Sequence, residues 1–97
     1  MMRNYEGVFI LNPDLATDAS KGIVTQIQDF ISKNGGRVDN LQDWGKRRMA
    51  YKINKKQDGN YVILNFQLDP SFTKKLELSL KLNEQVVRYM LVNKDDK

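Results

Sequence analysis

Residues 37–68 have the sequence RVDNLQDWGKRRMAYKINKKQDGNYVILNFQL, and this stretch decides the fold. Two segments within it are rich in alternating apolar and polar side chains and are predicted strands, residues 37–53 and 60–68. A turn is expected at Lys55–Gly59, so the two strands should pair as an antiparallel hairpin. Val38 and Leu41 lie three residues apart, and the first strand is therefore expected to contain a bulge and to bend.

A strand and a helix are predicted before this hairpin. Residues 4–11 alternate and carry Val, Phe, Ile and Leu, which is typical of a strand. In residues 17–33 the apolar side chains fall mainly three and four positions apart, which predicts a helix with Thr17 or Asp18 as its N-cap. The run Asn34-Gly35-Gly36 supplies the left-handed stop for this helix.

A second helix and a last strand follow the hairpin. Asp69 is expected to cap a helix over residues 70–82, with Pro70 at its first position. Residues 85–93 form a run of Val, Tyr, Met and Leu that predicts a strand. Residues 94–97 are a polar tail that is expected to fray.

The predicted order is strand, helix, strand, strand, helix, strand, which amounts to two split βαβ units. Right-handed crossovers place both helices on one face of a four-stranded antiparallel sheet. The sequence therefore predicts an α+β, ferredoxin-like two-layer sandwich. With 97 residues the chain is long enough for one core, so residues 1–97 are expected to form a single domain.

The composition limits the chemistry of the chain. It contains no cysteine and no histidine, which excludes disulfides, the usual zinc ligands and an imidazole base for nucleophilic catalysis. The acidic residues are scattered, and no pair is placed to share a substrate or a metal. No apolar run is long enough for a membrane span or a secretory signal. We therefore expect a soluble protein that is not an enzyme, with no cofactor, metal, small-molecule substrate or membrane partner.

Positive charge is concentrated in one part of the chain. Residues 44–56 contain six of the 16 Lys and Arg residues and none of the 12 Asp and Glu residues, so ten basic and twelve acidic residues remain elsewhere, a net charge of −2. This placement favours an edge that faces a polyanion. The alternative is a solvated hairpin whose lysines protect an edge strand from aggregation. The candidates for phosphate contacts are Lys46, Arg47 and Arg48, with Arg3 and Arg88 as more distant ones.

Trp44 lies at the start of this basic segment. An indole here would stack on a base, whereas a tryptophan beside a core strand more often packs under a loop. We expect packing, with base stacking as the alternative.

The sheet face turned away from the helices, here called the open face, should be polar. The alternation instead gives it the apolar side chains of Val8, Ile10, Tyr61, Ile63, Met90 and Val92. Apolar surface of this extent left in water predicts a covering partner.

Six short motifs, in this order, resemble the bacterial-type small-subunit ribosomal protein six family. They are Tyr5-Glu6, Asn12-Pro13, Gly36, the run WGKRRMAY at residues 44–51, Asp58-Gly59 and the run VRYM at residues 87–90. The resemblance spans almost the whole chain, and WGKRRMAY is its most specific part. It implies a structural role in the small subunit of a cytoplasmic or organellar ribosome. It also implies binding to small-subunit ribosomal RNA together with small-subunit ribosomal protein eighteen, in support of assembly and translation.

Three other protein classes share this order of elements. A stand-alone RNA-recognition module would expose aromatic side chains on its third strand, where this chain offers Tyr61. A ferredoxin-like homodimeric regulatory domain would cover the open face with a second copy. A small phosphohydrolase would need an anion-binding loop with arginine after the first strand, and residues 12–15 have the sequence NPDL instead.

Overall fold

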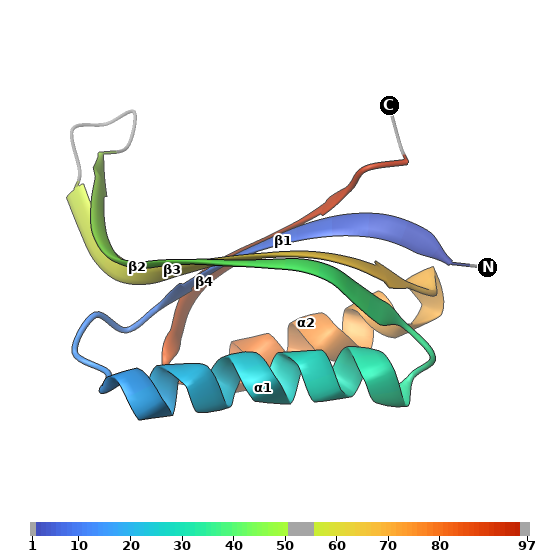
Figure 1. The fold of residues 1–97 in the computed structure, drawn as a ribbon, viewed down its shortest axis with the longest axis horizontal. Helices are drawn as coiled ribbons and strands as arrows, with labels where there is room; N and C mark the ends of the chain where they lie inside the picture. Colours follow the sequence, from blue (N-terminus) through green and yellow to red (C-terminus); the bar gives the residue numbers. More distant parts are fainter. Residues whose placement is uncertain (1, 51–55, 96–97) are drawn as a thin grey trace.

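A computed structural model of the protein describes residues 2–50 and 56–95. Its elements are β1 (Arg3–Leu11), α1 (Thr17–Lys33), β2 (Arg37–Ala50), β3 (Lys56–Leu68), the short 3₁₀ helix η1 (Pro70–Phe72), α2 (Thr73–Leu82) and β4 (Val86–Asn93). Within these residues the strands pair antiparallel in one four-stranded sheet, in the order β2-β3-β1-β4. Both helices cover the same face of the sheet (Figure 1). The predicted ferredoxin-like sandwich is confirmed.

The hydrophobic core lies between the helices and the sheet face that they cover. Because side chains alternate along a strand, every second residue of a strand points to this side. The strands contribute the buried side chains of Tyr5, Phe9, Leu11, Val62, Leu64, Phe66 and Leu68. The helices contribute apolar stripes with members four residues apart, Ile23, Ile27 and Ile31 from α1 and Leu76 and Leu80 from α2.

The backbone sets both ends of α1. The helix begins after Ala16, which is extended, and no side chain caps it, so the predicted N-cap at Thr17 or Asp18 is wrong. Both residues already belong to the first helical turn, where the carboxylate of Asp18 complements the positive end of the helix dipole. At the other end Gly35 has a φ of +79° and supplies the left-handed stop that was predicted.

The start of the second helical segment is tighter than predicted. Asp69 is extended, and its side chain accepts the backbone N–H of Ser71 at 2.9 Å, which confirms the predicted cap. Pro70–Phe72 form a 3₁₀ turn, so the α-helix begins at Thr73 and not at Pro70. In the described part of the chain, neither helix combines the length and apolar character that crossing a membrane requires.

The β2–β3 hairpin leaves the plane of the sheet. The register shifts where Asp39 and Trp44 stand unpaired, and these two irregularities confirm the predicted bulge and bend. At the second one Gly45 has a φ of +70°, and its N–H donates to the carboxylate of Asp43 at 2.9 Å. Beyond this point the hairpin curves away from the helices, toward the side of the open face (Figure 1).

The hairpin extends further than its turn residues suggested. Lys56–Gly59 were predicted as part of the turn, but they belong to β3 and pair with residues 47–50. This part of the prediction is wrong. Asp58-Gly59 is typical of a turn, but here the glycine lies within a strand, at a point where the strand passes close to Ile10. Residues 51–55, and with them the end of the first predicted hairpin strand, lie outside the described residues.

Gly59→Ala is expected to destabilise the fold by about 1–3 kcal/mol through overpacking. A Cβ at Gly59 would collide with Cγ2 of Ile10, a stiff β-branched side chain, and would lie 3.2 Å from the carbonyl oxygen of Leu11. Urea unfolding measures the change in the free energy of unfolding. Gly22→Ala is the matched control, because nothing lies within 4 Å of the new Cβ and alanine stabilises a helix by about 0.5–1 kcal/mol over glycine. An unchanged unfolding free energy in Gly59→Ala would contradict the close packing.

Candidate functional site

The basic segment lies on an edge strand of the sheet. The register pairs Lys46 with Asn60, Arg47 with Gly59 and Arg48 with Asp58, all within the part of the hairpin that bends out of the sheet. Since β2 is the outer strand in the order β2-β3-β1-β4, the backbone of this segment borders one side of the sheet. Two further basic residues of the segment, Lys52 and Lys55, lie outside the described residues.

Arg88 lies at the same end of the sheet as the basic segment. The strand registers place Arg88 opposite Ile10, Ile10 opposite Tyr61 and Tyr61 opposite Gly45. These four residues form one row across the sheet, and the row ends beside Lys46. The backbone positions of Arg88 and Gly45 are three strand spacings apart, about 14 Å. The structure thus brings the exposed Arg88 to the predicted RNA-binding end.

Arg3 lies at the opposite end of β1. It pairs with Leu68, and Ile10 lies seven positions further along the strand. At about 3.4 Å per residue, this separation is about 24 Å. The structure therefore does not bring Arg3 together with the other predicted RNA-binding residues.

Four of the predicted partner-face residues form an apolar strip across the open face. Val8 pairs with Ile63 on one side and with Met90 on the other, so these three side chains form one row. Met90 is 56% exposed, while Val8 and Ile63 are half-buried. Val92 is exposed in the neighbouring row, opposite Glu6. Because the strip is apolar and reaches the surface, it is suited to a protein contact.

Ile10 and Tyr61, the other two predicted partner-face residues, do not lie on exposed surface. They are 8% and 4% exposed, and neither belongs to the core cluster between the sheet and the helices. The hairpin bend explains their burial, because it brings Gly59 against the side chain of Ile10. The prediction that these two side chains are exposed on the open face is therefore wrong. Ile10 lies against the hairpin at Gly59, and Tyr61 is part of the hairpin strand β3.

The rest of the open face is polar, which was not predicted. The ammonium of Lys94 donates to the side-chain oxygen of Asn65 at 3.3 Å, and the amide of Gln67 donates to Asp39 at 3.3 Å. The signal was present in the alternation, because the same face of β1 and β3 carries Asn4, Glu6, Asn65 and Gln67. The open face therefore has an apolar middle and a polar end that is remote from the basic segment.

The beginning of the predicted polar tail is anchored to β1. The N–H of Lys94 donates to the carbonyl of Asn4 at 2.7 Å. The backbone N–H and side-chain amide of Asn4 donate to the carboxylate of Asp95 at 2.8 and 3.1 Å. The prediction of fraying is wrong for Lys94 and Asp95, since a local charge pattern does not reveal a partner at a sequence separation of 91. Residues 96–97 lie outside the described part of the chain.

The anchor at Asp95 predicts a dependence of stability on pH. Hydrogen bonds from the backbone and then the side chain of Asn4 hold the pKa of Asp95 below its usual range. A lowered pKa in the folded state stabilises the fold above the unfolded-state value of about 3.9, and this contribution is lost as pH falls through the folded-state pKa.

Asp95→Asn is therefore expected to lower the urea midpoint at pH 7, with a difference from the parent that shrinks as the pH falls below about 4. Unfolding curves at several pH values measure it. Asp14→Asn, at an exposed loop position, removes the same charge without touching Asn4 and serves as the control. A difference between Asp95→Asn and the parent that stays constant down to pH 2 would contradict the linkage.

Trp44 is half-exposed, so the expectation that it packs under a loop is wrong. Its side chain is 41% exposed and belongs neither to the core nor to the partly buried apolar side chains that pack against the core. The indole Nε1–H donates to Oε1 of Gln42 at 3.3 Å. As the unpaired residue of a bulge, Trp44 stands outside the alternation that directs neighbouring side chains into the core.

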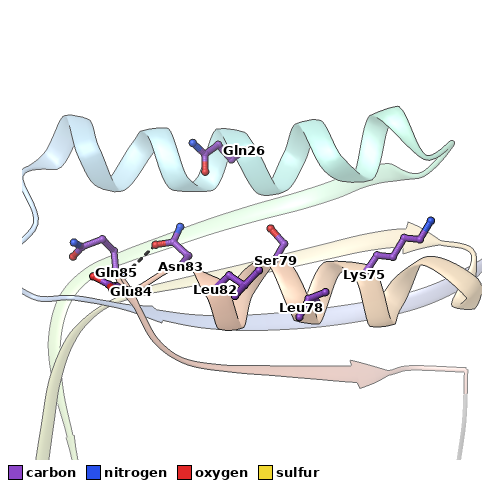
Figure 2. Close-up of a pocket in the computed structure, with 8 residues that line it drawn as sticks. All are labelled: Gln26, Lys75, Leu78, Ser79, Leu82, Asn83, Glu84 and Gln85. Carbon is purple, nitrogen blue, oxygen red and sulfur yellow. Dashed lines mark hydrogen bonds between the residues drawn. The ribbon is translucent and has the colours of Figure 1, made fainter.

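A groove lies between α1 and the end of α2. Figure 2 shows the side chains that line it: Gln26, Lys75, Leu78, Ser79, Leu82, Asn83, Glu84 and Gln85. Ser79 has no imidazole to act as its base, because the chain contains no histidine. The described residues contain no group of three or more acidic side chains placed to hold a metal ion. The groove therefore holds no serine–histidine pair.

Comparisons with known proteins agree in sequence and in fold. The family model described as ribosomal protein S6 matches residues 4–93. Small ribosomal subunit protein bS6 of Thermoanaerobacter pseudethanolicus is 40% identical over 95 residues, which cover 98% of this chain and all of the relative. The bS6 protein of Clostridium novyi is 42% identical over 92 residues, or 95% and 97% of the two chains. The crystal structure of 30S ribosomal protein S6 from Thermotoga maritima matches with a TM-score of 0.86 at 25% identity, covering 99% of this chain and 91% of that one.

Proposed function

Because this chain belongs to the ribosomal protein S6 family, we propose that it binds small-subunit ribosomal RNA together with small-subunit ribosomal protein eighteen. Membership in the family makes the chain a structural component of the small ribosomal subunit and not an enzyme. A role in the subunit requires contacts with RNA or with other ribosomal proteins. The two surfaces described above differ in charge and polarity and suit these two kinds of contact.

The RNA contact is proposed at the hairpin end of the sheet. Lys46, Arg47 and Arg48 follow one another on an edge strand, and the sheet register adds Arg88 at the same end. Guanidinium groups form bidentate hydrogen bonds with phosphate, so the adjacent Arg47 and Arg48, with Arg88 further across the same end of the sheet, suit an RNA backbone. The placement of these four basic residues at one end of the sheet is the observation that carries the proposal. Arg3, about 24 Å from Ile10 along β1, would contact RNA at a separate place.

The protein contact is proposed on the apolar strip of the open face. Val8, Ile63, Met90 and Val92 would bury their exposed parts against ribosomal protein eighteen. Ile10 and Tyr61, which are buried near the hairpin bend, would support this surface without touching the partner. The basic segment is part of the β2–β3 hairpin, and Ile63 of the strip lies in β3 of the same hairpin, so a partner on the strip would lie close to the RNA.

Binding to a transcript of bacterial small-subunit ribosomal RNA, with and without ribosomal protein eighteen, tests the proposal. Tight binding is expected with the partner and weak binding without it. The chain offers RNA only its basic residues, and its apolar strip is suited to the partner protein. If four basic residues contact phosphates, log affinity should fall with log salt concentration with a slope of about −3. Binding that is absent or insensitive to salt in both conditions would overturn the proposal.

The stand-alone RNA-recognition module is the weaker alternative. Such a module stacks bases on aromatic side chains of its open face, and Tyr61, the aromatic side chain predicted for that role, is buried. A homodimeric regulatory domain would use the apolar strip for a second copy. Sedimentation of the purified chain, alone and with RNA, distinguishes the regulatory domain from the RNA-recognition module. A stable dimer without RNA affinity would favour the regulatory domain.

A further inference from the structure

Trp44 occupies a position that neither the core nor the proposed protein surface explains. It lies directly before Gly45 and Lys46, at the bulge where the hairpin begins to bend. Its indole is 41% exposed, although burial of a tryptophan is strongly favourable. Its exposed ring at the start of a basic segment is therefore available for contact with a partner that the basic residues attract.

Local hydrogen bonds hold this part of the strand in one conformation. The N–H of Gly45 donates to the carboxylate of Asp43 at 2.9 Å, and the positive φ of Gly45 fixes the direction of the chain after the bulge. The indole Nε1–H of Trp44 donates to Gln42 at 3.3 Å, so its polar edge is satisfied within the protein. The exposed part of the ring is therefore suited to contact through its π-face and not through a hydrogen bond.

We propose that Trp44 stacks on an unpaired base of the RNA that the basic segment holds. This inference rests on the proposed function, because the phosphates held by Lys46, Arg47 and Arg48 would bring the base to the ring. Aromatic side chains beside cationic groups are the usual means of holding unpaired bases, since every base has a π-face. A polyanion fits this position better than an apolar protein surface does, because residues 44–56 carry six positive charges and no negative one.

The single tryptophan of the chain allows a direct test. The chain is labelled with 5-fluorotryptophan and combined first with unlabelled ribosomal protein eighteen and then with the small-subunit ribosomal RNA transcript. The fluorine resonance is expected to shift when RNA is added and to change little when the partner is added. Circular dichroism of each variant verifies the fold.

Two substitutions measure the contribution of the ring to affinity in the same complex. Trp44→Leu, which keeps an apolar side chain but removes the π-face, should weaken RNA binding at least about five-fold. Trp44→Phe should bind within about two-fold of the parent, because it retains an aromatic face. Neither variant should change the slope of log affinity against log salt, since stacking releases no counterions.

The outcomes separate this inference from the proposed function. RNA binding by Trp44→Leu as tight as that of the parent would overturn the stacking and leave the function intact. A fluorine shift on addition of the partner alone, with none on addition of RNA, would assign Trp44 to the protein interface and also overturn it. Failure of the parent complex to bind RNA at any salt concentration would overturn the proposed function, and the stacking with it.

Discussion

Replacing Lys46, Arg47 and Arg48 together by glutamine is expected to weaken RNA binding on the order of 10³-fold and to flatten its salt dependence. A hydrogen bond to a charged group contributes about 1.5 kcal/mol at the low end of its range, and 1.4 kcal/mol corresponds to a factor of ten in affinity. Three of the four proposed phosphate contacts disappear, so the slope of log affinity against log salt should change from about −3 to about −1. Titration of the partner-bound protein with RNA at several salt concentrations measures both quantities.

A matched control separates the position of the charges from their number. Lys21, Lys74 and Lys81 are exposed on α1 and α2, which cover the sheet face opposite the open face. Their joint replacement by glutamine removes the same three charges and should leave the salt slope close to that of the parent. Equal losses in the two triple variants would mean that net charge, and not the hairpin end of the sheet, determines the affinity.

Phe66→Ala is expected to destabilise the protein by about 3–5 kcal/mol, a large part of the 5–15 kcal/mol that holds a typical domain folded. Phe66 is 1% exposed, and β3, which carries it, is paired on both sides. Its ring stacks on that of Tyr5, with the ring centroids 5.6 Å apart. Alanine would remove this contact and leave a cavity between the sheet and the helices. Urea unfolding followed by circular dichroism measures the loss.

Leu82→Ala is the control for the loss of apolar volume. Leu82 lies at the end of α2 and is 74% exposed, so its truncation should change the free energy of unfolding by no more than about 0.5 kcal/mol. If Phe66→Ala cost no more than Leu82→Ala, the side chain of Phe66 would not lie in the core.

The fold was predictable because its signals are local. The alternation of residues 60–68 and the left-handed stop at Gly35 are set by neighbours in the sequence, and both appear in the structure. The spacing of Val38 and Leu41 likewise indicated a bulge, which the register shows at Asp39. Each of these features depends on a few consecutive residues, so its physical cause is visible in the sequence.

The predictions that failed depend on contacts between distant parts of the chain. The alternation of apolar and polar residues indicated which side chains share a face of the sheet. It did not indicate that the hairpin would curve and that Ile10 and Tyr61 would be buried. The curvature arises at the bulge of Trp44 and Gly45, and its effect on β1 is a tertiary contact. The anchoring of Asp95 on Asn4 is also a contact between the two ends of the described chain. The sequence alone located the charges of the basic segment. The strand registers were needed to show that Arg88 lies at the same end of the sheet as this segment and that Arg3 lies at the opposite end.

The strand order has a consequence for how the protein is made. β1 is synthesised first, but its two neighbours in the sheet are β3 and β4, which come from the second half of the chain. At about 5–20 residues per second, the first strand waits roughly 4–16 s before β4 has been translated. Until then one edge of β1 is unpaired, and its apolar side chains are not fully covered by the rest of the core. The sheet can therefore close only after β4 has been translated, and the nascent chain must avoid aggregation during the interval.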